Sequence, residues 1–344
     1  MTGTSSALAA AVLFGLATPL AKLLLTPLDP WLLAGVLYLG SGIGLAVVRW
    51  IRVDRGPGLG RQGVPWLLAA IGCGGLIGPV LLMWGLARTN ASTASLLLNS
   101  EGIFTALIAW FVFRENFDRR IALGMLLIVV GGVILALPGN DGADASLPSL
   151  AIVGACLAWA LDNNLTRKVA LADPTTIAML KGLVAGTVNV ALAFVVGASL
   201  PSPTQLGAAA VLGFVSYGVS LVLFVSSLQR LGTARTAAYF SIAPFVGAAL
   251  SVLLLKEAVT WQLGIAAVSM AAGVWLHLTE QHVHRHTHEA MNHEHEHEHE
   301  HDAHHRHEHS IPVARGTRHS HWHHHEPMTH SHEHYPDAHH RHRH

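Results

Sequence analysis

The sequence predicts an all-α membrane protein with ten transmembrane helices, arranged as two inverted five-helix repeats and followed by a disordered tail. Three observations lead to this fold class. Of the 344 residues, 51% are hydrophobic and only 12% are charged, and the mean hydropathy is +0.42. All 26 histidines lie at or beyond His277, so a histidine-free apolar body precedes a polar tail. The body also contains a displaced copy of its own pattern, which is typical of inverted repeats.

The body divides into apolar stretches long enough to cross a bilayer, which takes roughly 17 to 25 residues. In chain order they cover residues 6–25, 31–48, 65–87, 92–113, 121–137, 150–170, 175–196, 207–228, 233–255 and 261–278. Residues 1–6 contain no Lys or Arg, so the charged region that opens a secretory signal peptide is missing. We therefore expect the first stretch to remain as a transmembrane helix.

Basic residues in the connections indicate the orientation. One set of alternate connections carries eleven Lys and Arg residues between Arg49 and Arg235, whereas the other set carries only Lys22, Arg88 and Lys256. The basic side should face the cytoplasm. An even number of spans then places both the N-terminus and the C-terminus on the cytoplasmic side of a cell membrane.

Charge and cysteine content exclude several classes of protein. The body has a formal charge of +5 and the tail −5, so a basic nucleic-acid-binding domain is not expected. Cys73 and Cys156 both fall in apolar runs, which excludes a disulfide-stapled secreted scaffold. No constellation of catalytic residues is evident, so we expect no enzyme and no required cofactor.

Two segments of the body come into register when the sequence is shifted against itself. A shift of 142 positions places Arg88 on Arg230 and Phe113-Arg114-Glu115 on Leu255-Lys256-Glu257, and a shift of 144 places Asp29-Pro30 on Asp173-Pro174. Each copy would hold five spans. Because five is odd, the second copy would enter the membrane in the opposite sense to the first.

The fourth and ninth spans contain a distinctive set of motifs: Ala-Ser-Leu-Leu-Leu-Asn-Ser-Glu at 94–101, Phe-Thr-Ala-Leu-Ile-Ala-Trp at 104–110 with Glu115, Ala243-Pro244-Phe245, and Lys256-Glu257. With these motifs the chain resembles the EamA branch of the drug/metabolite transporter superfamily. The resemblance covers about residues 1–279. Family members typically carry Glu-Pro at the equivalent point of both halves, whereas here Glu101 precedes Gly102 and Pro244 follows Ala243.

The resemblance implies a domain organisation and a function. Residues 1–140 and 149–279 would be the two five-helix repeats of the EamA type, and residues 280–344 a disordered His-rich cytoplasmic tail. The chain would be a secondary transporter that exports a small organic metabolite or drug-like solute. Its partners would be the lipid bilayer, the solute and protons.

Ionisable side chains inside the spans are candidates for transport, because each costs roughly 2.5 to 3.5 kcal/mol to insert into hydrocarbon. Glu101 lies near the expected midplane, where a protonatable group suits proton coupling; a hydrogen-bonded carboxyl that joins two helices is the alternative. Asp162 and Lys181 lie at similar depths, so they could form a structural ion pair or bind a zwitterionic or anionic solute.

Polar and aromatic side chains at helical spacing indicate a central cavity. Trp159, Asp162, Asn163 and Thr166 follow i, i+3, i+4, i+7 on the sixth predicted helix. Asn99, Tyr217 and Tyr239 complete the candidate site, and Pro19, Pro79 and Pro244 are candidate hinges.

The tail predicts metal binding, because imidazole suits Ni, Co, Zn and Cu. Its candidate ligands are His293, His295, His297, His299, His301, His304, His305, His307, His309, His319, His321, His323, His324 and His325. The H-E-x-x-H match at 293–297 arises from the repetitive composition and does not indicate a zinc protease. A divalent-metal exporter, or a metal-responsive membrane protein, is the alternative function, and the absence of histidine from residues 1–276 disfavours a metal pore.

Overall fold

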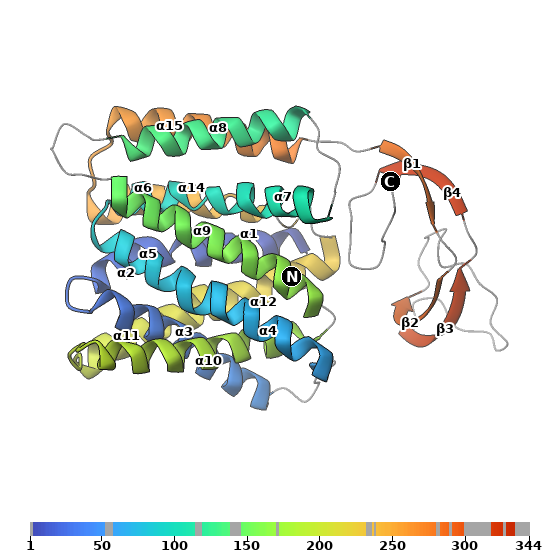
Figure 1. Cartoon of the computed structure of the whole chain (residues 1–344), viewed down its shortest axis with the longest axis horizontal. Helices are drawn as coiled ribbons and strands as arrows, with labels where there is room; N and C mark the ends of the chain where they lie inside the picture. The colour runs from blue at the N-terminus through green and yellow to red at the C-terminus, as the bar shows by residue number, and fades with distance from the viewer. Residues whose placement is uncertain are drawn as a thin grey trace. The chain divides into compact units, whose positions relative to one another are not determined.

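A computed structural model describes residues 3–51, 58–113, 119–137, 146–169, 172–231, 236, 239–279, 283–288, 291–298, 318–325 and 328–333 of the chain (Figure 1). The chain forms two compact units, Met1–Glu280 and Gln281–His344. The first is the helical body and the second is the tail, and each is described by itself.

The body is built from helices joined by short connections. Up to the middle of the chain these are α1 (Gly3–Gly15), α2 (Ala17–Leu24), α3 (Pro30–Ile51), η1 (Arg61–Gly63), α4 (Val64–Ala70), η2 (Ile71–Ile77), α5 (Gly78–Ala87), α6 (Ala91–Leu97), α7 (Ser100–Phe113) and α8 (Arg119–Ala136). The later elements are α9 (Ser146–Thr166), η3 (Arg167–Val169), α10 (Pro174–Val195), α11 (Pro203–Gly213), η4 (Phe214–Val219), α12 (Ser220–Leu231), α14 (Ala243–Leu255) and α15 (Trp261–Leu278).

The body has the lengths and surface of a membrane protein. Five helical stretches are long and apolar enough to cross a bilayer: Gly3–Leu24, Pro30–Ile51, Arg61–Ala87, Pro174–Val195 and Pro203–Ser227. Shorter apolar helices cover Ala122–Ala136, Ala243–Leu255 and Trp261–Leu276. Large apolar side chains face outward, with Val195 83% and Leu253 72% exposed. Such a surface is stable in lipid and not in water, so the predicted helical membrane body is confirmed.

Several of these stretches are interrupted near small residues or prolines. The elements η2 and η4 are π-helical, and a shift of 142 positions would carry η2 onto residues 213–219, where η4 lies. The three candidate hinge prolines lie at the starts of helices: Pro19 in α2 just after a break at Leu16, Pro79 at the start of α5 after η2, and Pro244 at the start of α14. Their role as hinges remains a prediction.

Helices α3 and α10 form the longest helix pair of the body. Each has 22 residues, and they are displaced by 144 positions. They run antiparallel, because Arg49 near the end of α3 pairs with Asp173 at 2.8 Å before the start of α10, whereas Trp31 near the start of α3 contacts Asn189 near the end of α10. We name the two ends of the body the Asp29 end and the Arg49 end.

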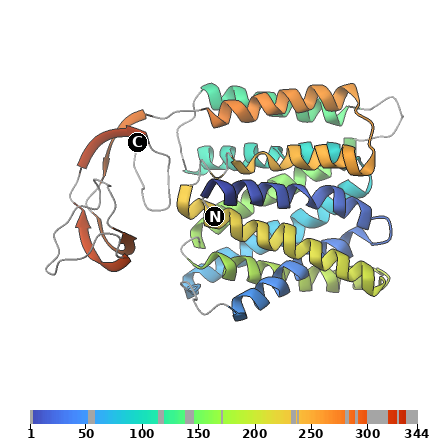
Figure 2. The ribbon, with the colours of Figure 1, turned by 180° about the vertical axis from the view of Figure 1, so that it is seen from behind.

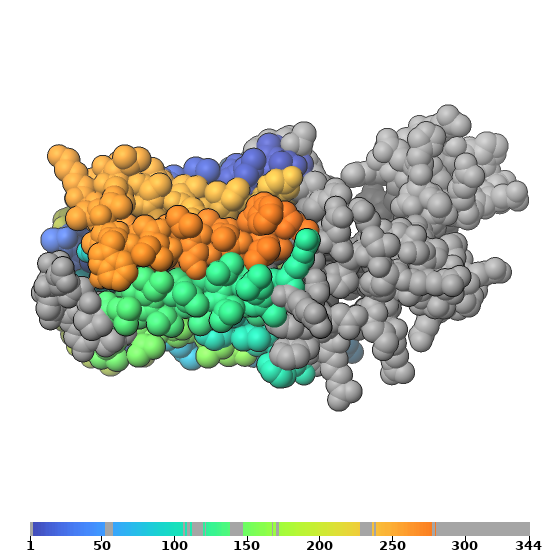
Figure 3. Space-filling model, turned by 90° about the horizontal axis from the view of Figure 1, so that it is seen from above, coloured from blue at the N-terminus to red at the C-terminus, as the bar shows by residue number. Residues whose placement is uncertain are grey.

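Helices α8 and α15 form a second antiparallel pair, displaced by 142 positions and 18 residues long in each case. The hydroxyl of Ser269 donates to the carbonyl of Leu127, its counterpart under the 142-position shift, at 2.8 Å. Figures 1 and 2 show this pair at one edge of the body and α3 with α10 at the opposite edge. Figure 3 shows α15 in orange with α8 in green beside it. Helices α6, α7, α9 and α14 lie between these edges.

The tail differs from the predicted disorder over the ranges that the structure describes. Strand β1 (Val283–His288) pairs antiparallel with β4 (Met328–Glu333), and β2 (Met291–Glu298) pairs antiparallel with β3 (Arg318–His325). The low hydrophobicity of the tail predicts that it has no core, but strand pairing needs no core. Alternating His and Glu suits an extended backbone, whose N–H and C=O groups pair with those of a second strand.

The close contact between α3 and α10 gives the first prediction. A Cβ atom on Gly182 would lie 2.5 Å from the backbone nitrogen of Gly42 and 2.6 Å from its Cα, whereas a Cβ on Gly207 would meet nothing within 4 Å. Gly182→Ala should therefore force the helices apart and destabilise the body by about 1 to 3 kcal/mol. Thermal unfolding of the purified protein in detergent measures this, with Gly207→Ala as the control of unchanged or slightly raised Tm. An unchanged Tm for Gly182→Ala would contradict the packing described.

Candidate functional site

The polar stripe predicted on the sixth span lies on α9, and its members contact several neighbouring helices. Trp159 and Asp162 are buried, with 7% and 8% exposure, and Asn163 is exposed. The stripe therefore faces neighbouring helices along one side of α9. Its contacts join α9 to η2, α7 and α10, and they define the candidate site.

Glu101 pairs with Asn163. It lies in the first turn of α7, just after the break at Leu98 and Asn99 that separates α6 from α7. Its Oε1 accepts a hydrogen bond of 2.7 Å from Nδ2 of Asn163. The partner that the structure gives to Glu101 is thus a neutral amide, which leaves the charge of an ionised carboxylate unbalanced.

Asp162 and Lys181 form the ion pair that the sequence allowed. The Lys181 ammonium lies 2.5 Å from Oδ1 of Asp162, and the two side chains are 13% and 11% exposed. Lys181 also donates to the hydroxyl of Thr166 at 2.7 Å, and that hydroxyl donates to Asp162 at 2.9 Å. The acid in this cluster is therefore neutralised within the protein.

The carbonyl groups of η2 are bound by side chains from three other helices. The carbonyl of Gly74 accepts from the Tyr38 hydroxyl at 2.8 Å and from Nε1 of Trp159 at 2.9 Å. The next carbonyl, of Gly75, accepts from Nδ2 of Asn189 at 2.9 Å. A π-helix leaves carbonyls without their usual helical donors, so these side chains hold the irregular turn in place. Asp162 packs directly against Gly74, where a Cβ would not fit.

Aromatic rings extend the cluster toward α1 and η4. The Tyr217 ring lies 5.6 Å from Tyr38 and 5.9 Å from Phe14, and Phe14 lies 5.3 Å from Phe240, measured between ring centroids. Tyr217 is thus brought to the candidate site. Tyr239 is half-buried, and no described side-chain contact joins it to these rings.

The remaining predicted residues lie apart from this cluster or outside the described part of the chain. Asn99 is buried and donates to the carbonyl of Leu96 at 3.0 Å and toward the sulfur of Met270 at 3.9 Å. Among the described residues, no group of three or more His, Cys, Asp or Glu side chains could hold a metal ion.

The predicted metal ligands of the tail fall into two sets. On the strands lie His293, His295, His297, His319, His321, His323, His324 and His325, while His299, His301, His304, His305, His307 and His309 are outside the described residues. In the register of β2 and β3, His293 is opposite His323, His295 opposite His321 and His297 opposite His319.

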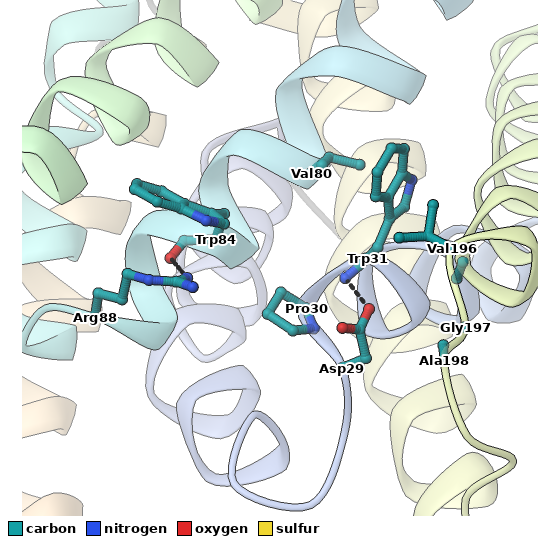
Figure 4. A pocket seen from close by; sticks show the side chains of 10 residues that line it. Asp29, Pro30, Trp31, Val80, Trp84, Arg88, Val196, Gly197 and Ala198 are labelled. Carbon is teal, nitrogen blue, oxygen red and sulfur yellow. Dashed lines mark hydrogen bonds between the residues drawn. The ribbon is translucent and has the colours of Figure 1, made fainter.

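A pocket of about 220 Å³ opens at the Asp29 end, away from the predicted site residues (Figure 4). Its walls come from the start of α3, the end of α5 and the end of α10. Arg88 lies 4.3 Å from the Trp84 ring and donates to the Trp84 carbonyl at 3.0 Å. Oδ1 of Asp29 accepts from the backbone nitrogens of Trp31 and Leu32 at the start of α3. The polar groups that line this pocket therefore already serve the helix ends around it.

Sequence reasoning missed several residues of the cluster around α9, and also two charged residues, Lys22 and Glu257, that contact other helices at the Asp29 end. Tyr38 and Trp31 lie in an apolar stretch without a polar pattern, and Asn189 belongs to a polar stripe of α10 but was not included in the candidate site. Lys22 and Glu257 lie at the ends of predicted spans, where charges are expected for solvation alone. The signal that would have identified Tyr38 and Asn189 is the π-helix that they support, and hydropathy does not reveal it.

Two known transporters and one solved structure are similar to this chain. An "Uncharacterized transporter" of Methanothermobacter thermautotrophicus is 27% identical over 80% of this chain and 85% of its own length. A "Probable amino-acid metabolite efflux pump" of Salmonella typhimurium is 24% identical over 55% of this chain and 67% of its own. A crystal structure of a protein with 18% identity superposes with a TM-score of 0.59, covering 80% of this chain and 95% of the other, which shows a shared fold.

A family model gives the assignment. It describes the EamA-like transporter family, and it matches twice, at residues 1–137 and 147–279. These matches cover the helical body and leave the histidine-rich tail outside. The chain therefore belongs to the EamA-like transporter family and is a multi-pass membrane transporter.

Proposed function

We propose that this transporter exports a small organic solute by alternating access and that proton binding at Glu101 drives the export. The observation that carries the proposal is the convergence of polar and aromatic side chains from both halves of the body. Glu101 of the first half contacts Asn163 of the second, Trp159 contacts Gly74, and Tyr38 contacts Tyr217. A site built from two halves changes its access when the halves move relative to each other.

Ten transmembrane helices in two inverted repeats form part of the proposal. Two observations support the arrangement: the family model matches twice, and the helix pairs α3 with α10 and α8 with α15 join segments of equal length displaced by 144 and 142 positions. Both pairs are antiparallel, as an inverted repeat requires. The excess of basic residues in alternate connections supports a cytoplasmic location of the Arg49 end and both termini, with the Asp29 end outside.

The class of solute follows from the chemistry of the cluster. Aromatic rings, an amide and a carboxyl group suit an organic molecule with one polar or charged group, whereas a transition metal would prefer imidazole or thiolate ligands. Among the relatives, one is named an amino-acid metabolite efflux pump, and another, 42% identical over 22% of this chain, is named a subunit of a 4-amino-4-deoxy-L-arabinose-phosphoundecaprenol flippase. These names support an organic solute and transport out of the cytoplasm.

Replacing Glu101 tests the coupling. Glu101→Gln keeps the size of the side chain and its oxygen acceptor for Asn163, but it cannot exchange a proton. Uptake of a panel of radiolabelled amino acids into inside-out vesicles should lose its dependence on the proton gradient and fall at least about tenfold, which corresponds to roughly 1.4 kcal/mol. Asp162→Asn is a poor control because it unpairs Lys181, so Asn90→Ala at the Asp29 end serves instead. Unchanged pH dependence in Glu101→Gln would exclude the coupling role.

The pair of Asp162 and Lys181 gives a prediction on stability. Lys181→Met should leave a buried carboxylate without a counter-ion and destabilise the body by about 3 to 5 kcal/mol. The double variant Asp162→Asn with Lys181→Met removes both charges and should recover most of the lost Tm. Thermal unfolding in detergent distinguishes the variants. Equal Tm values for Lys181→Met and the unaltered protein would show that the ion pair does not stabilise the folded body.

We also propose that the tail binds Ni, Co, Zn or Cu and acts as a metal-responsive or buffering appendage to the carrier. The opposed histidines of β2 and β3 support metal binding, because residues opposite each other on paired strands lie close together. Removing the chain after Leu278 should abolish Ni or Zn binding by the purified protein while vesicle transport of the organic solute continues.

A growth assay separates this role from the alternative of a divalent-metal exporter. Strains that lack the protein, carry the full chain, or carry the chain truncated after Leu278 are compared on toxic Ni, Co, Zn and Cu. We expect loss of the whole protein to have no larger effect on tolerance than loss of the tail. Metal sensitivity that appears only when the body is removed would instead favour the metal exporter.

A further inference from the structure

Lys22 binds the end of another helix at the Asp29 end of the body. Its half-buried ammonium group donates to the carbonyls of Leu86 at 2.6 Å, Ala87 at 3.3 Å and Thr89 at 2.7 Å. Helix α5 ends at Ala87, and the last carbonyls of a helix have no donor within the helix. A lysine ammonium has three protons to donate, and here three carbonyls lie within hydrogen-bond distance of it.

Glu257 binds the start of the next helix. Its two carboxylate oxygens accept from the backbone nitrogens of Ala91 at 2.7 Å and Ser92 at 2.9 Å. These are among the first N–H groups of α6, which lack acceptors within the helix, and Asn90 at the N-cap position forms no side-chain cap. Glu257 thus replaces the local cap with a carboxylate from the connection between α14 and α15.

The backbone before Glu257 is strained. Lys256 has a φ of 54° and is the one residue other than glycine with a positive φ in the described part of the chain. A bulky residue adopts this conformation at an energetic cost, and it persists where surrounding contacts require it. It reverses the chain at the end of α14, and the next carboxylate reaches the start of α6.

Together these contacts hold one turn of the chain, residues 86–92, from two sides. The cation comes from the first predicted span and the anion from the connection between the last two, 64 to 67 and 165 to 166 positions away. The turn connects α5 to α6, and α6 leads through the break at Leu98 and Asn99 to Glu101. The position of the candidate site is therefore linked to this turn through one short helix.

We propose that Lys22 and Glu257 form a latch that closes the Asp29 end of the carrier, and that the latch opens whenever the Glu101 site faces that end. The inference rests on the proposed alternating access. All the groups in the latch lie at the end of a span, where water replaces the lost hydrogen bonds once the latch opens. The close contact of α3 and α10 has no such substitute, since Gly182 and Gly42 pack backbone against backbone. The latch is thus the contact that can separate.

Cysteine labelling tests the latch without any knowledge of the solute. Cys73 and Cys156 are first replaced by Ser, and Ser95→Cys is introduced as a reporter. Ser95 lies one turn inside α6, is 0% exposed and has no hydrogen-bond partner for its hydroxyl among the described residues, so a thiol fits there. A membrane-impermeant maleimide is added from each side of the membrane, in right-side-out and inside-out vesicles.

We expect slow labelling from the Asp29 side while the latch is intact and at least about tenfold faster labelling from that side in Lys22→Gln or Glu257→Gln. Arg88→Gln is the matched control, because it removes a cation from the same turn that donates to Trp84 and takes no part in the latch. Unchanged labelling in both latch variants, with folding confirmed by an unchanged gel-filtration profile, would overturn the proposal. Because labelling needs no solute, the proposal is decided even if no transported solute is found.

A cross-link provides the second test. An ideal Cβ on Gly247 of α14 would lie 3.1 Å from the Cβ of Ser95 and 3.0 Å from the carbonyl oxygen of Gly15. A shift of α14 by a few tenths of an ångström would bring the two Cβ atoms to the spacing of about 3.5 to 4.5 Å in disulfides. Ser95→Cys with Gly247→Cys in the same background should cross-link α6 to α14 on oxidation and stop transport, and a reductant should restore it. Full transport by the oxidised chain would show that transport does not require α6 and α14 to separate, and would overturn the latch independently of the labelling result.

Discussion

A peptide group without a partner is costly in hydrocarbon, and this constraint explains where the polar side chains of the body lie. Each unbroken helix satisfies its own backbone, but every break exposes N–H or C=O groups that need partners from elsewhere. Tyr38, Trp159 and Asn189 bind the carbonyls of η2, and Lys22 and Glu257 bind the two helix ends at residues 86–92. Each of these breaks therefore requires polar side chains that bind its free backbone groups, and this requirement accounts for the positions of those side chains.

The same constraint makes the two halves of the body interdependent. Trp159 and Asn189 belong to the later half of the chain but bind η2 of the earlier half, and Glu257 caps α6 in the same manner. Tyr38 and Lys22 of the earlier half bind part of these breaks, and side chains of the later half bind the rest. The two antiparallel helix pairs at the edges of the body differ from these breaks. Small residues bring α3 close to α10 and α8 close to α15, so few polar contacts are needed there. The body thus combines tight apolar helix pairs at its edges with polar contacts between them.

The sequence predicted the parts of this structure that depend on single segments. Hydropathy located the apolar stretches, and helical spacing placed Trp159, Asp162, Asn163 and Thr166 on one face. It also allowed the pairing of Asp162 with Lys181, because the two lie at similar depths. In contrast, the hydrogen-bond partners of Glu101 and Lys22 lie 62 to 67 positions away along the chain. A local sequence pattern cannot predict contacts between residues so far apart.

Hydropathy and composition leave two features of the structure unpredicted, each for a physical reason. A π-helix differs from an α-helix by one residue in a turn, a difference that hydropathy does not register, so the cluster around Gly74 was not foreseen. In the tail, low hydrophobicity indicated disorder, yet the alternation of His and Glu also permits pairing of extended strands. Composition determines whether a core can form, but it does not determine whether backbone groups pair.

Buried Asp162 and half-buried Glu101 differ in what remains for them to bind. Asp162 already has a cation, since the Lys181 ammonium lies 2.5 Å away, and the Thr166 hydroxyl completes the contact. Glu101 accepts a hydrogen bond from the side-chain amide of Asn163, and an amide can orient a carboxylate without neutralising its charge. An ionised Glu101 in this setting requires a positive charge from outside the protein, which a proton or a cationic group of a solute can supply. Asp162 thus joins α9 to α10 through Lys181, whereas the contact of Glu101 with Asn163 leaves the charge of an ionised carboxylate without a counter-ion.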